Sequence, residues 1–331
     1  MADTEPLLAS IVIPTYNGET YLRQILEAAL AQRVDGEFEV IVIDSGSTDS
    51  TLAIVASFPA VRLHQIPNSE FGHGRTRNLA AQLARGTFVA FLTHDAIPAT
   101  DRWLHELLAP FAIDERILGV MGKQIPRPTC FPLMKYDIQG VFSGFGPEFG
   151  TTVFYDDGFV QDEGTRGAIT FYSDVNSAAR RATLTGPIPY RDVPYAEDQL
   201  FGQDVIAAGY LKAYAPRAAV VHSNDLTLAE FGPRIFDETV GLRRIGTVVP
   251  PMSWAGAHAR AARGALRDTA TILRDGSYTW RRKLYWVVVN PAYHLAKWRA
   301  YRKATLVDVT DEARVNADSL EHRRKTSGQA D

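Results

Sequence analysis

Four short runs of mostly apolar residues, separated by stretches with helical periodicity, restrict the fold of this chain more than any other feature. They occupy residues 9–14, 38–43, 61–65 and 87–92. Apolar runs that do not alternate with polar residues are typical of strands buried on both faces of a sheet. Strands that follow one another through helices form parallel sheets with right-handed crossovers. We therefore expect an α/β protein.

The rest of the chain first continues this pattern and then leaves it. The expected helices cover residues 19–32, 51–57, 75–84 and 103–111. Residues 119–167 are rich in Gly and Pro, and we expect them to form a long functional loop. Regular structure should return at residues 168–173 and 175–181, followed by a helix at 196–208 and a strand at 212–221. We expect a first domain at residues 1–225 and a helical extension at 226–331, with a frayed polar tail past residue 308.

Composition and charge exclude several classes of function. The formal net charge of -3 gives no general attraction to nucleic acid. Cys130 is the single cysteine, which excludes an internal disulfide and a CxxC motif, and we interpret it as a passive thiol. The first ten residues, MADTEPLLAS, lack the order of a secretory signal, and no apolar run approaches the ~20 residues that span a bilayer. We expect the protein to stay in the cytoplasm.

Polar side chains stand where several predicted strands end. Asp44, Asp95 and His222 each follow an apolar run, and Glu197 and Asp198 begin a predicted helix. Because the carboxyl ends of strands in such a sheet meet at one edge, residues far apart in sequence can converge there. We expect these groups to share one site.

Several longer motifs occur in an order that resembles a known family. IVIPTYNG, VIDSGSTDST, RTRNLAAQLARGTFVAFLTHDAIP and AEDQLFGQDVIAAGY with AVVHSN resemble the inverting family 2 glycosyltransferases of GT-A fold. Within that family, FGHGRTRN, LTHDAIP, FYSDVNSAARR and AEDQ are similar to bacterial rhamnosyltransferases. The resemblance covers about residues 8–225. It implies a Rossmann-like, mostly parallel sheet flanked by helices, to which the C-terminal helical extension is added.

The resemblance implies a nucleotide-binding role for the ends of the first two strands. Pro14, Thr15 and Tyr16 would line the nucleotide pocket, and Asp44 would accept hydrogen bonds from the ribose or base. The alternative for Asp44 is the cap of the helix that follows it.

The resemblance also implies a metal site, which hard oxygen ligands for Mg or Mn would suit. GT-A enzymes usually carry Asp-x-Asp, but this chain has Thr93, His94 and Asp95. His222 resembles the late histidine of many such transferases, and imidazole with a carboxylate suits Mn somewhat better than Mg. We therefore expect Asp95 and His222 as ligands, with Thr93 and His94 near the donor. The alternatives are a helix cap for Asp95 and a hydrogen bond to a carbonyl for His222.

A glycine-containing segment, FGHG, precedes the predicted helix at residues 75–84. It is no dinucleotide fingerprint, because it follows no apolar strand and Arg77 stands where the third glycine belongs. Arg75 or Arg77 is expected to face donor phosphate, with Asn78 beside them, because a guanidinium binds such oxygens bidentately. The alternative for the two arginines is a solvated helix start.

The resemblance gives the transfer step to the Glu-Asp motif. Asp198 would be the base that takes the acceptor proton, and Glu197 would position the acceptor or the helix. Asp174 is expected to bind an acceptor hydroxyl. The alternative for the acidic pair is interaction with the helix dipole. Aromatic residues within 119–167 fit either an acceptor cleft or a core beneath a loop.

The C-terminal region alternates basic and aromatic residues. Eleven Lys and Arg residues between 260 and 303 are interspersed with Trp280, Trp286, Tyr293 and Trp298. This mixture is expected of helices that rest on an anionic bilayer, as a lipid-linked acceptor would require. The same helices also fit packing on the catalytic domain or a homo-oligomer interface.

Together these observations predict a metal-dependent inverting hexosyltransferase. The resemblance implies that it moves L-rhamnose from dTDP-L-rhamnose to a hydroxyl of a bacterial surface glycan or lipid-linked acceptor, and we expect it at the inner face of the cell membrane. Two alternatives stay open. A non-catalytic nucleotide or glycan binder is favoured by Thr93 in place of an acid, and a nucleotidyltransferase would release pyrophosphate.

Overall fold

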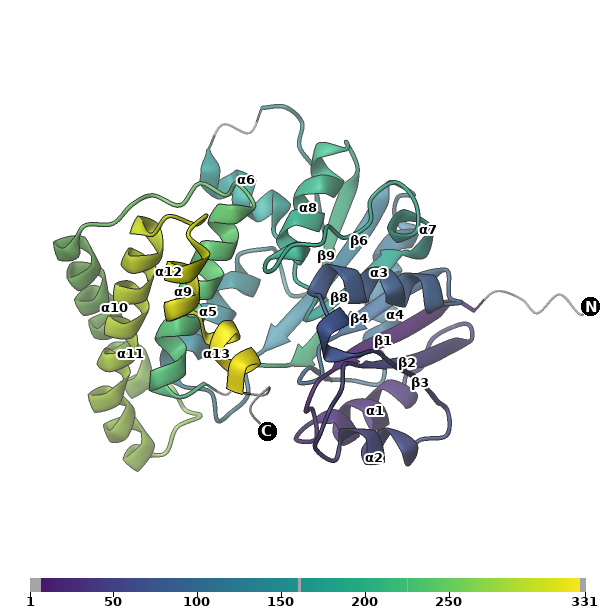
Figure 1. Ribbon diagram of the computed structural model, residues 1–331, viewed down its shortest axis with the longest axis horizontal. Coiled ribbons are helices and arrows are strands. Elements are labelled where there is room, and N and C mark those ends of the chain that lie inside the picture. The colour runs from purple at the N-terminus through teal and green to yellow at the C-terminus, as the bar shows by residue number, and fades with distance from the viewer. Residues whose placement is uncertain (1–6, 160–161, 225, 328–331) are drawn as a thin grey trace, which may run out of the picture. The chain divides into compact units, whose positions relative to one another are not determined.

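The computed structural model describes residues 7–159, 162–224 and 226–327, which form two compact units (Figure 1). The first unit comprises the described residues up to Pro126 together with Ile138–Ser223. The second comprises Arg127–Asp137 and the described residues from Asn224 onward. Arg127–Asp137 lies inside the range expected for the first domain, yet it packs with the second unit. One reason is that Leu133 N donates a hydrogen bond to Asn290 Oδ1 at 3.0 Å.

The first half of the sheet is parallel, as the sequence predicts. Its strands are β1 (Ala9–Thr15), β2 (Phe38–Asp44), β3 (Val61–Gln65) and β4 (Phe88–Leu92), in the order β3-β2-β1-β4. Ile11 and Ile13 face one buried layer and Val12 the other, so both faces of β1 are covered. The register pairs Thr15 with Asp44, which brings the carboxyl ends of β1 and β2 level.

The second half of the sheet is mixed. β8 (Asn176–Arg180) runs antiparallel to β4 and to β6 (Ile117–Ile125), whereas β6 is parallel to β9 (Leu211–Val221). Two short strands, β5 (Ile97–Pro98) and β7 (Thr152–Phe154), pair antiparallel with β9. The expectation of one long loop at residues 119–167 was therefore wrong, since β6, β7 and α5 (Pro132–Ser143) use much of it.

A glycine in β6 shows why this segment looks irregular in sequence. A Cβ atom at Gly122 would lie 2.1 Å from Ala218 O on β9. The neighbouring backbone comes too close for any side chain, so the strand needs glycine there.

Helices cover both faces of this sheet, with α1 and α2 on one side and α3 and α8 on the other (Figure 1). The helices of the first unit are α1 (Leu22–Leu30), α2 (Thr51–Ala56), α3 (His73–Leu83), α4 (Trp103–Leu108), α6 (Glu163–Thr170), α7 (Arg181–Leu184) and α8 (Glu197–Ala207). Short 3-10 turns occur at Asn68–Glu70 and Ala109–Ala112.

The second unit is helical. Its elements are α9 (Leu228–Arg244), α10 (Trp254–Arg274), α11 (Trp280–Leu306), α12 (Glu312–Asp318) and α13 (Leu320–Ser327). α11 packs against both α9 and α10, and Phe131 stacks on Tyr293 at 4.2 Å in its core. Among the described residues, no helix combines the length and apolarity needed to cross a bilayer.

The tail past residue 308 differs from the expected frayed end. It forms α12 and α13, and Leu320 N donates to Asp237 Oδ2 of α9 at 2.9 Å. Val315 is buried with Phe236 and Val240. Although the tail is mostly polar, its apolar side chains Val315 and Leu320 are buried, and α12 and α13 pack on α9.

Candidate functional site

The loops that follow β1 and β2 are joined at their bases by side-chain hydrogen bonds. Thr15 Oγ1 donates to Asp44 Oδ1 at 2.9 Å. Asp44 Oδ2 accepts from Gly46 N and Ser47 N, both at 3.0 Å. Asp44 is fully buried, so in this structure the carboxylate serves the turn. Asp44 does not cap the helix that follows, because α2 begins only at Thr51 and its N-cap residue is Ser50. Pro14 and Thr15 are the last two residues of β1, and Tyr16, which follows them directly, is exposed.

A second group of polar side chains forms where β4, β6 and β9 end. His222 Nε2 lies 3.3 Å from Asp95 Oδ2, and Thr93 Oγ1 donates to Asp95 Oδ1 at 2.6 Å. The pairing of Ile97 with Val221 brings these two chain segments side by side. Gln124 Oε1 at the end of β6 contacts His222 Nδ1 at 2.9 Å. We call Asp95, Thr93, His222 and Gln124 the histidine cluster.

The histidine cluster favours an ionised carboxylate. Burial opposes the charge on Asp95, but His222 and the Thr93 hydroxyl outweigh it and hold the pKa of Asp95 well below its usual range. A carbonyl oxygen can only accept, so Nδ1 of His222 carries the proton shared with Gln124. His222 Nε2 therefore faces Asp95 with either a second proton or a lone pair.

These two atoms fit a divalent cation. A carboxylate oxygen and an imidazole nitrogen that face one another across 3.3 Å can both reach one ion. No set of three or more His, Cys, Asp and Glu side chains suited to a metal occurs in the described part of the chain. A cation here would thus take its remaining ligands from donor oxygens and water. The ring of His94, which was expected near the donor, lies against Gly18.

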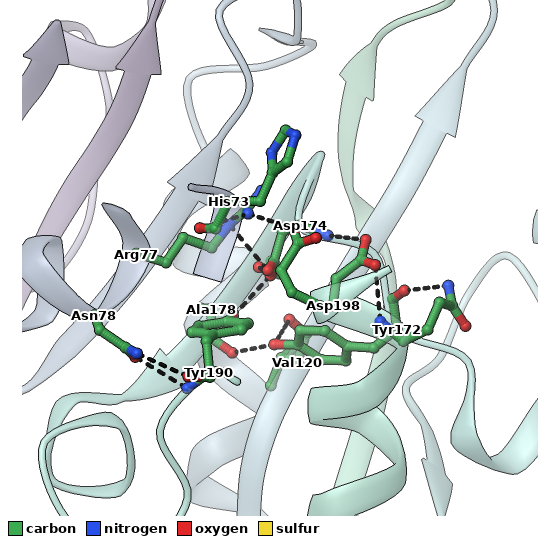
Figure 2. A network of polar contacts seen from close by, with 12 residues as sticks. His73, Arg77, Asn78, Val120, Tyr172, Asp174, Ala178, Tyr190 and Asp198 are labelled. Carbon is green, nitrogen blue, oxygen red and sulfur yellow. Dashed lines mark hydrogen bonds and ion pairs between the residues drawn. The ribbon is translucent and has the colours of Figure 1, made fainter. Parts of the chain in front are cut away.

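A third group surrounds Arg77 of α3 (Figure 2). Arg77 Nη1 lies 2.5 Å from Glu197 Oε1, and Nε forms an ion pair with Asp174 Oδ2 at 3.0 Å. Asp174 Oδ1 also accepts from Ser177 Oγ at 2.6 Å and from Tyr190 OH at 2.9 Å. We call Arg77, Asp174, Glu197 and Asp198 the arginine cluster.

Asp198 differs from the other two acids of the arginine cluster. Asp174 and Glu197 are buried and ion-paired, whereas Asp198 is partly accessible. Its Oδ2 accepts from Asp174 N at 3.3 Å. Burial and the nearby Glu197 and Asp174 carboxylates raise the pKa of Asp198 to about 8, against the opposing effect of Arg77. The arginine cluster therefore has one guanidinium for three carboxyl groups, which favours uptake of a proton by Asp198 near neutral pH.

The two clusters are connected through Gln124. Its Oε1 accepts from His222, and its Nε2 donates to Ser173 Oγ at 3.1 Å. Ser173 precedes Asp174, whose backbone N–H donates to Asp198. A continuous path of hydrogen bonds and one peptide unit therefore runs from the ion pair of Asp95 to the carboxyl group of Asp198.

Several residues lie where the sequence did not place them. Arg75 or Arg77 was expected to face phosphate, but Arg77 is 6% exposed and held by two carboxylates. Asp174 was expected to bind acceptor, but it is 1% exposed and enclosed by its partners. Arg75 pairs with Asp192 at the surface, at 2.8 Å.

Asn78 and Glu197 have structural partners as well. The Asn78 amide exchanges two hydrogen bonds with the Tyr190 backbone, at 2.8 and 2.9 Å. Glu197 fixes the first turn of α8 to α3 through Arg77. Of the two roles considered for Glu197, this geometry fits positioning of the helix.

Sequence reasoning missed Gln124, Ser177 and Tyr190. Gln124 lies in the segment that was interpreted as a loop. Tyr190 lies 66 positions after Gln124, in a segment for which no element was predicted. The FYSDVNS motif contains both Asp174 and Ser177, and their spacing of three is compatible with a local turn. No comparable signal marks the other two.

Similarity to known proteins identifies the family of this chain. Residues 10–184 match the model of the family described as glycosyl transferase family 2. The chain is 31% identical over 235 residues to the O-antigen chain rhamnosyltransferase RfbN of Salmonella typhimurium, covering 70% of this chain and 71% of that one. It is 32% identical over 234 residues to the O-antigen chain rhamnosyltransferase WbaN of Salmonella anatum, with the same coverage.

A solved structure shows the same fold. It is that of Staphylococcus aureus TarS residues 1–349 in complex with UDP-GlcNAc, with a TM-score of 0.53 and 19% identity. The likeness covers 94% of this chain and 79% of that one. The mixed sheet with flanking helices is therefore a GT-A fold. Since the family model spans more than half of the chain, and relatives above 30% identity cover 70% of it, this protein belongs to glycosyl transferase family 2.

Proposed function

We propose that this glycosyltransferase moves L-rhamnose from dTDP-L-rhamnose to a hydroxyl group of a bacterial surface glycan or its lipid-linked precursor, with inversion at the anomeric carbon. The observation that carries the proposal is the contrast between two carboxyl groups on one path of polar contacts. The pKa of Asp95 is held low beside His222, whereas burial and neighbouring carboxylates raise the pKa of Asp198. The choice of rhamnose rests on the two O-antigen rhamnosyltransferases that the chain resembles.

The donor would lie over the carboxyl ends of β1, β2 and β4. Tyr16 is exposed and available to pack on the base, and Pro14 and Thr15 form the adjoining strand end. Asp44 could reach a ribose hydroxyl only by sharing an oxygen that the turn already uses. Asp95 and His222 would hold Mn or Mg, which when bound neutralises the charge of the departing diphosphate.

Asp198 would act as the base. Its carboxylate takes the proton of the acceptor hydroxyl while that oxygen bonds to the anomeric carbon. The bond from that carbon to the diphosphate oxygen breaks, and dTDP leaves with the electron pair. Glu197 and Arg77 keep Asp198 in place, because their ion pair anchors the first turn of α8. A pKa near the working pH suits a group that must both accept and release a proton.

The test is a panel of nucleotide sugars incubated with the full chain and Mg or Mn. We expect release of the nucleoside diphosphate to be fastest with dTDP-L-rhamnose, and faster still with a glycan acceptor. Pyrophosphate release would identify a nucleotidyltransferase instead. Faster turnover of another sugar would remove rhamnose but keep the glycosyltransferase.

A second candidate is a non-catalytic binder of nucleotide or glycan. The observation that favours it is Thr93, which stands where an acid is usual and donates to Asp95 rather than adding a ligand. Calorimetry with dTDP-L-rhamnose and dTDP separates the two functions. Tight binding without turnover of any donor in the panel would support the binder.

A further inference from the structure

The hairpin formed by α10 and α11 has an unusual charge balance. Residues 254–306 contain eleven Lys and Arg but two acids, whereas the whole chain has 35 cations and 38 acids. Both acids are used inside the unit. Asp268 is 1% exposed and contacts His294 Nε2 at 2.8 Å, and Asp275 accepts from Lys135 Nζ at 2.5 Å. The solvent-facing charge of this hairpin is therefore positive.

Large apolar side chains are exposed where the two helices meet. We define the hairpin tip as residues 266–288, the end of α10, the connecting turn and the start of α11. Lys283 Nζ donates to Leu273 O at 2.7 Å and ties the two helix ends together. The exposed apolar side chains of the tip are Leu266, Leu273, Trp280, Leu284, Tyr285 and Val288.

The apolar side chains of the tip are not the ones that form the core. Ile272 and Trp286 are buried in the unit, while Trp280 and Val288 are 66% and 77% exposed. Arg274, Arg281 and Arg282 are exposed among them. Both helices thus have a packed face and a second face that mixes apolar and cationic groups.

We propose that the hairpin tip binds the surface of a bilayer that contains anionic lipids. Trp280, Leu284 and Val288 would enter the interface between headgroups and acyl chains, where indole rings and aliphatic groups are favoured. Arg274, Arg281 and Arg282 would contact lipid phosphates. The attachment is peripheral, and it would place the enzyme where lipid-linked glycans are built, although lipid binding itself does not depend on the proposed transfer activity.

A second copy of the chain fits this surface less well. A twofold dimer places the same patch on both partners, so the arginines of one tip would face those of the other. No exposed acid within residues 254–306 is available to compensate them. Like charges at such an interface repel, whereas an anionic bilayer attracts every one of them.

Vesicle partitioning tests the proposal. The chain of 331 residues is mixed with vesicles of phosphatidylcholine alone or with added phosphatidylglycerol, and bound protein is separated by flotation. We expect binding to the anionic vesicles only, weakened by salt. The combined variant Arg274→Gln, Arg281→Gln and Arg282→Gln should lower the partition coefficient roughly 100-fold, since each cation near an anionic surface contributes about 1 kcal/mol.

The matched control removes three exposed arginines from the first unit, by Arg23→Gln, Arg33→Gln and Arg217→Gln. It loses the same charge, and we expect its partition coefficient to stay within about threefold of the parent. If both triple variants lowered the partition coefficient equally, net charge alone would explain the binding, and the assignment to the hairpin tip would be overturned. Thermal unfolding of both variants verifies that each is folded.

Depth of insertion provides a second readout. Brominated lipids quench tryptophans that enter the interface, and Trp280→Phe should remove most of the quenching. Quenching that persists in this variant would place the contact elsewhere. Sedimentation of the protein without lipid tests the rival occupant: a dimer that the triple tip variant dissociates, with no vesicle binding by the parent, would assign the tip to self-association.

Discussion

The histidine cluster and the arginine cluster place the same side chain in opposite electrostatic surroundings. Asp95 faces one imidazole and one hydroxyl, and its pKa is held well below the usual range. Asp198 lies beside two other carboxyl groups that share a single guanidinium, and its pKa rises to about 8. The ratio of acids to cations, more than burial alone, separates the two.

This difference gives each carboxyl group a distinct chemical use. A carboxylate that stays ionised is suited to a cation, and one that binds a proton near neutral pH is suited to proton transfer. Pairs of acids with divergent pKa values are a general sign of divided roles in an active site. The path through Gln124 and Ser173 makes the two clusters neighbours in one bonded network.

The largest expected effect separates the two clusters by function. Asp198→Asn removes the proton acceptor, so transfer should fall by 10²- to 10⁴-fold while donor affinity stays near that of the parent. Steady-state kinetics and calorimetry with the donor measure the two quantities. Asp204→Asn is the matched control, since Asp204 lies on the same helix and pairs with the exposed Arg191. Near-normal turnover of Asp198→Asn would exclude it as the base.

Next comes the stability of the arginine cluster. Arg77→Met leaves Asp174 and Glu197 buried without a cation and should lower the free energy of unfolding by about 3–5 kcal/mol. Arg75→Met on the same helix breaks only an exposed pair with Asp192 and should cost less than about 1 kcal/mol. Urea unfolding at pH 7 compares them. Similar losses in both variants would contradict the assignment of Arg77 as the counter-ion of the cluster.

The histidine cluster should respond to metal concentration instead. His222→Ala removes one of two proposed ligand atoms, so the Mn or Mg concentration for half-maximal activity should rise by more than roughly 100-fold. This exceeds the roughly 10- to 100-fold loss of metal affinity that follows removal of a residue that only supports a ligand. His64→Ala on β3 serves as control. An unchanged metal titration would exclude His222 as a ligand.

A smaller change in the metal requirement is expected for variants of Gln124, which contacts the ring nitrogen of His222 that does not face Asp95. Gln124→Met removes the acceptor that fixes His222 Nδ1, and should raise the metal requirement about tenfold. Gln124→Glu retains an acceptor at this position and should recover most of the loss. If both variants behave alike, Gln124 acts through packing and not through the imidazole.

The smallest expected effect is on the pH dependence of the free energy of unfolding, to which Asp198 and Asp95 should contribute with opposite sign. Asp198 binds its proton more tightly when folded, so the stability of the parent relative to Asp198→Asn should fall by at least about 1 kcal/mol as pH rises from 4 to 8. Asp95 is the reverse case, because its pKa is lowered on folding. Its contribution should be present above about pH 4 and lost as pH falls below it. Urea titrations across pH measure both, and parallel slopes would refute the contrast between the clusters.

Part of this arrangement was predictable because it depends on local patterns. The apolar runs gave the four parallel strands within one or two residues, and their order placed Asp44, Asp95 and His222 after strand ends. The contact of Asp95 with His222 agrees with the expectation of a shared site for two of the three groups, whereas Asp44 bonds to Thr15 and to its own turn. Such predictions succeed because a strand that is buried on both faces needs consecutive apolar residues, and these are visible in the sequence.

The sequence by itself thus determined an α/β sheet, the polar groups at its edge and the presence of a helical extension. Only the tertiary structure decided what those groups contact. Arg77 meets Asp174 and Glu197 across 97 and 120 positions because β8 runs antiparallel beside β4 and α8 packs near α3. Those contacts turn a predicted phosphate ligand into a buried counter-ion. A proton affinity depends on every charge within a few ångströms. Glu197 is next to Asp198 in the sequence, but only long-range packing adds Asp174 and Arg77.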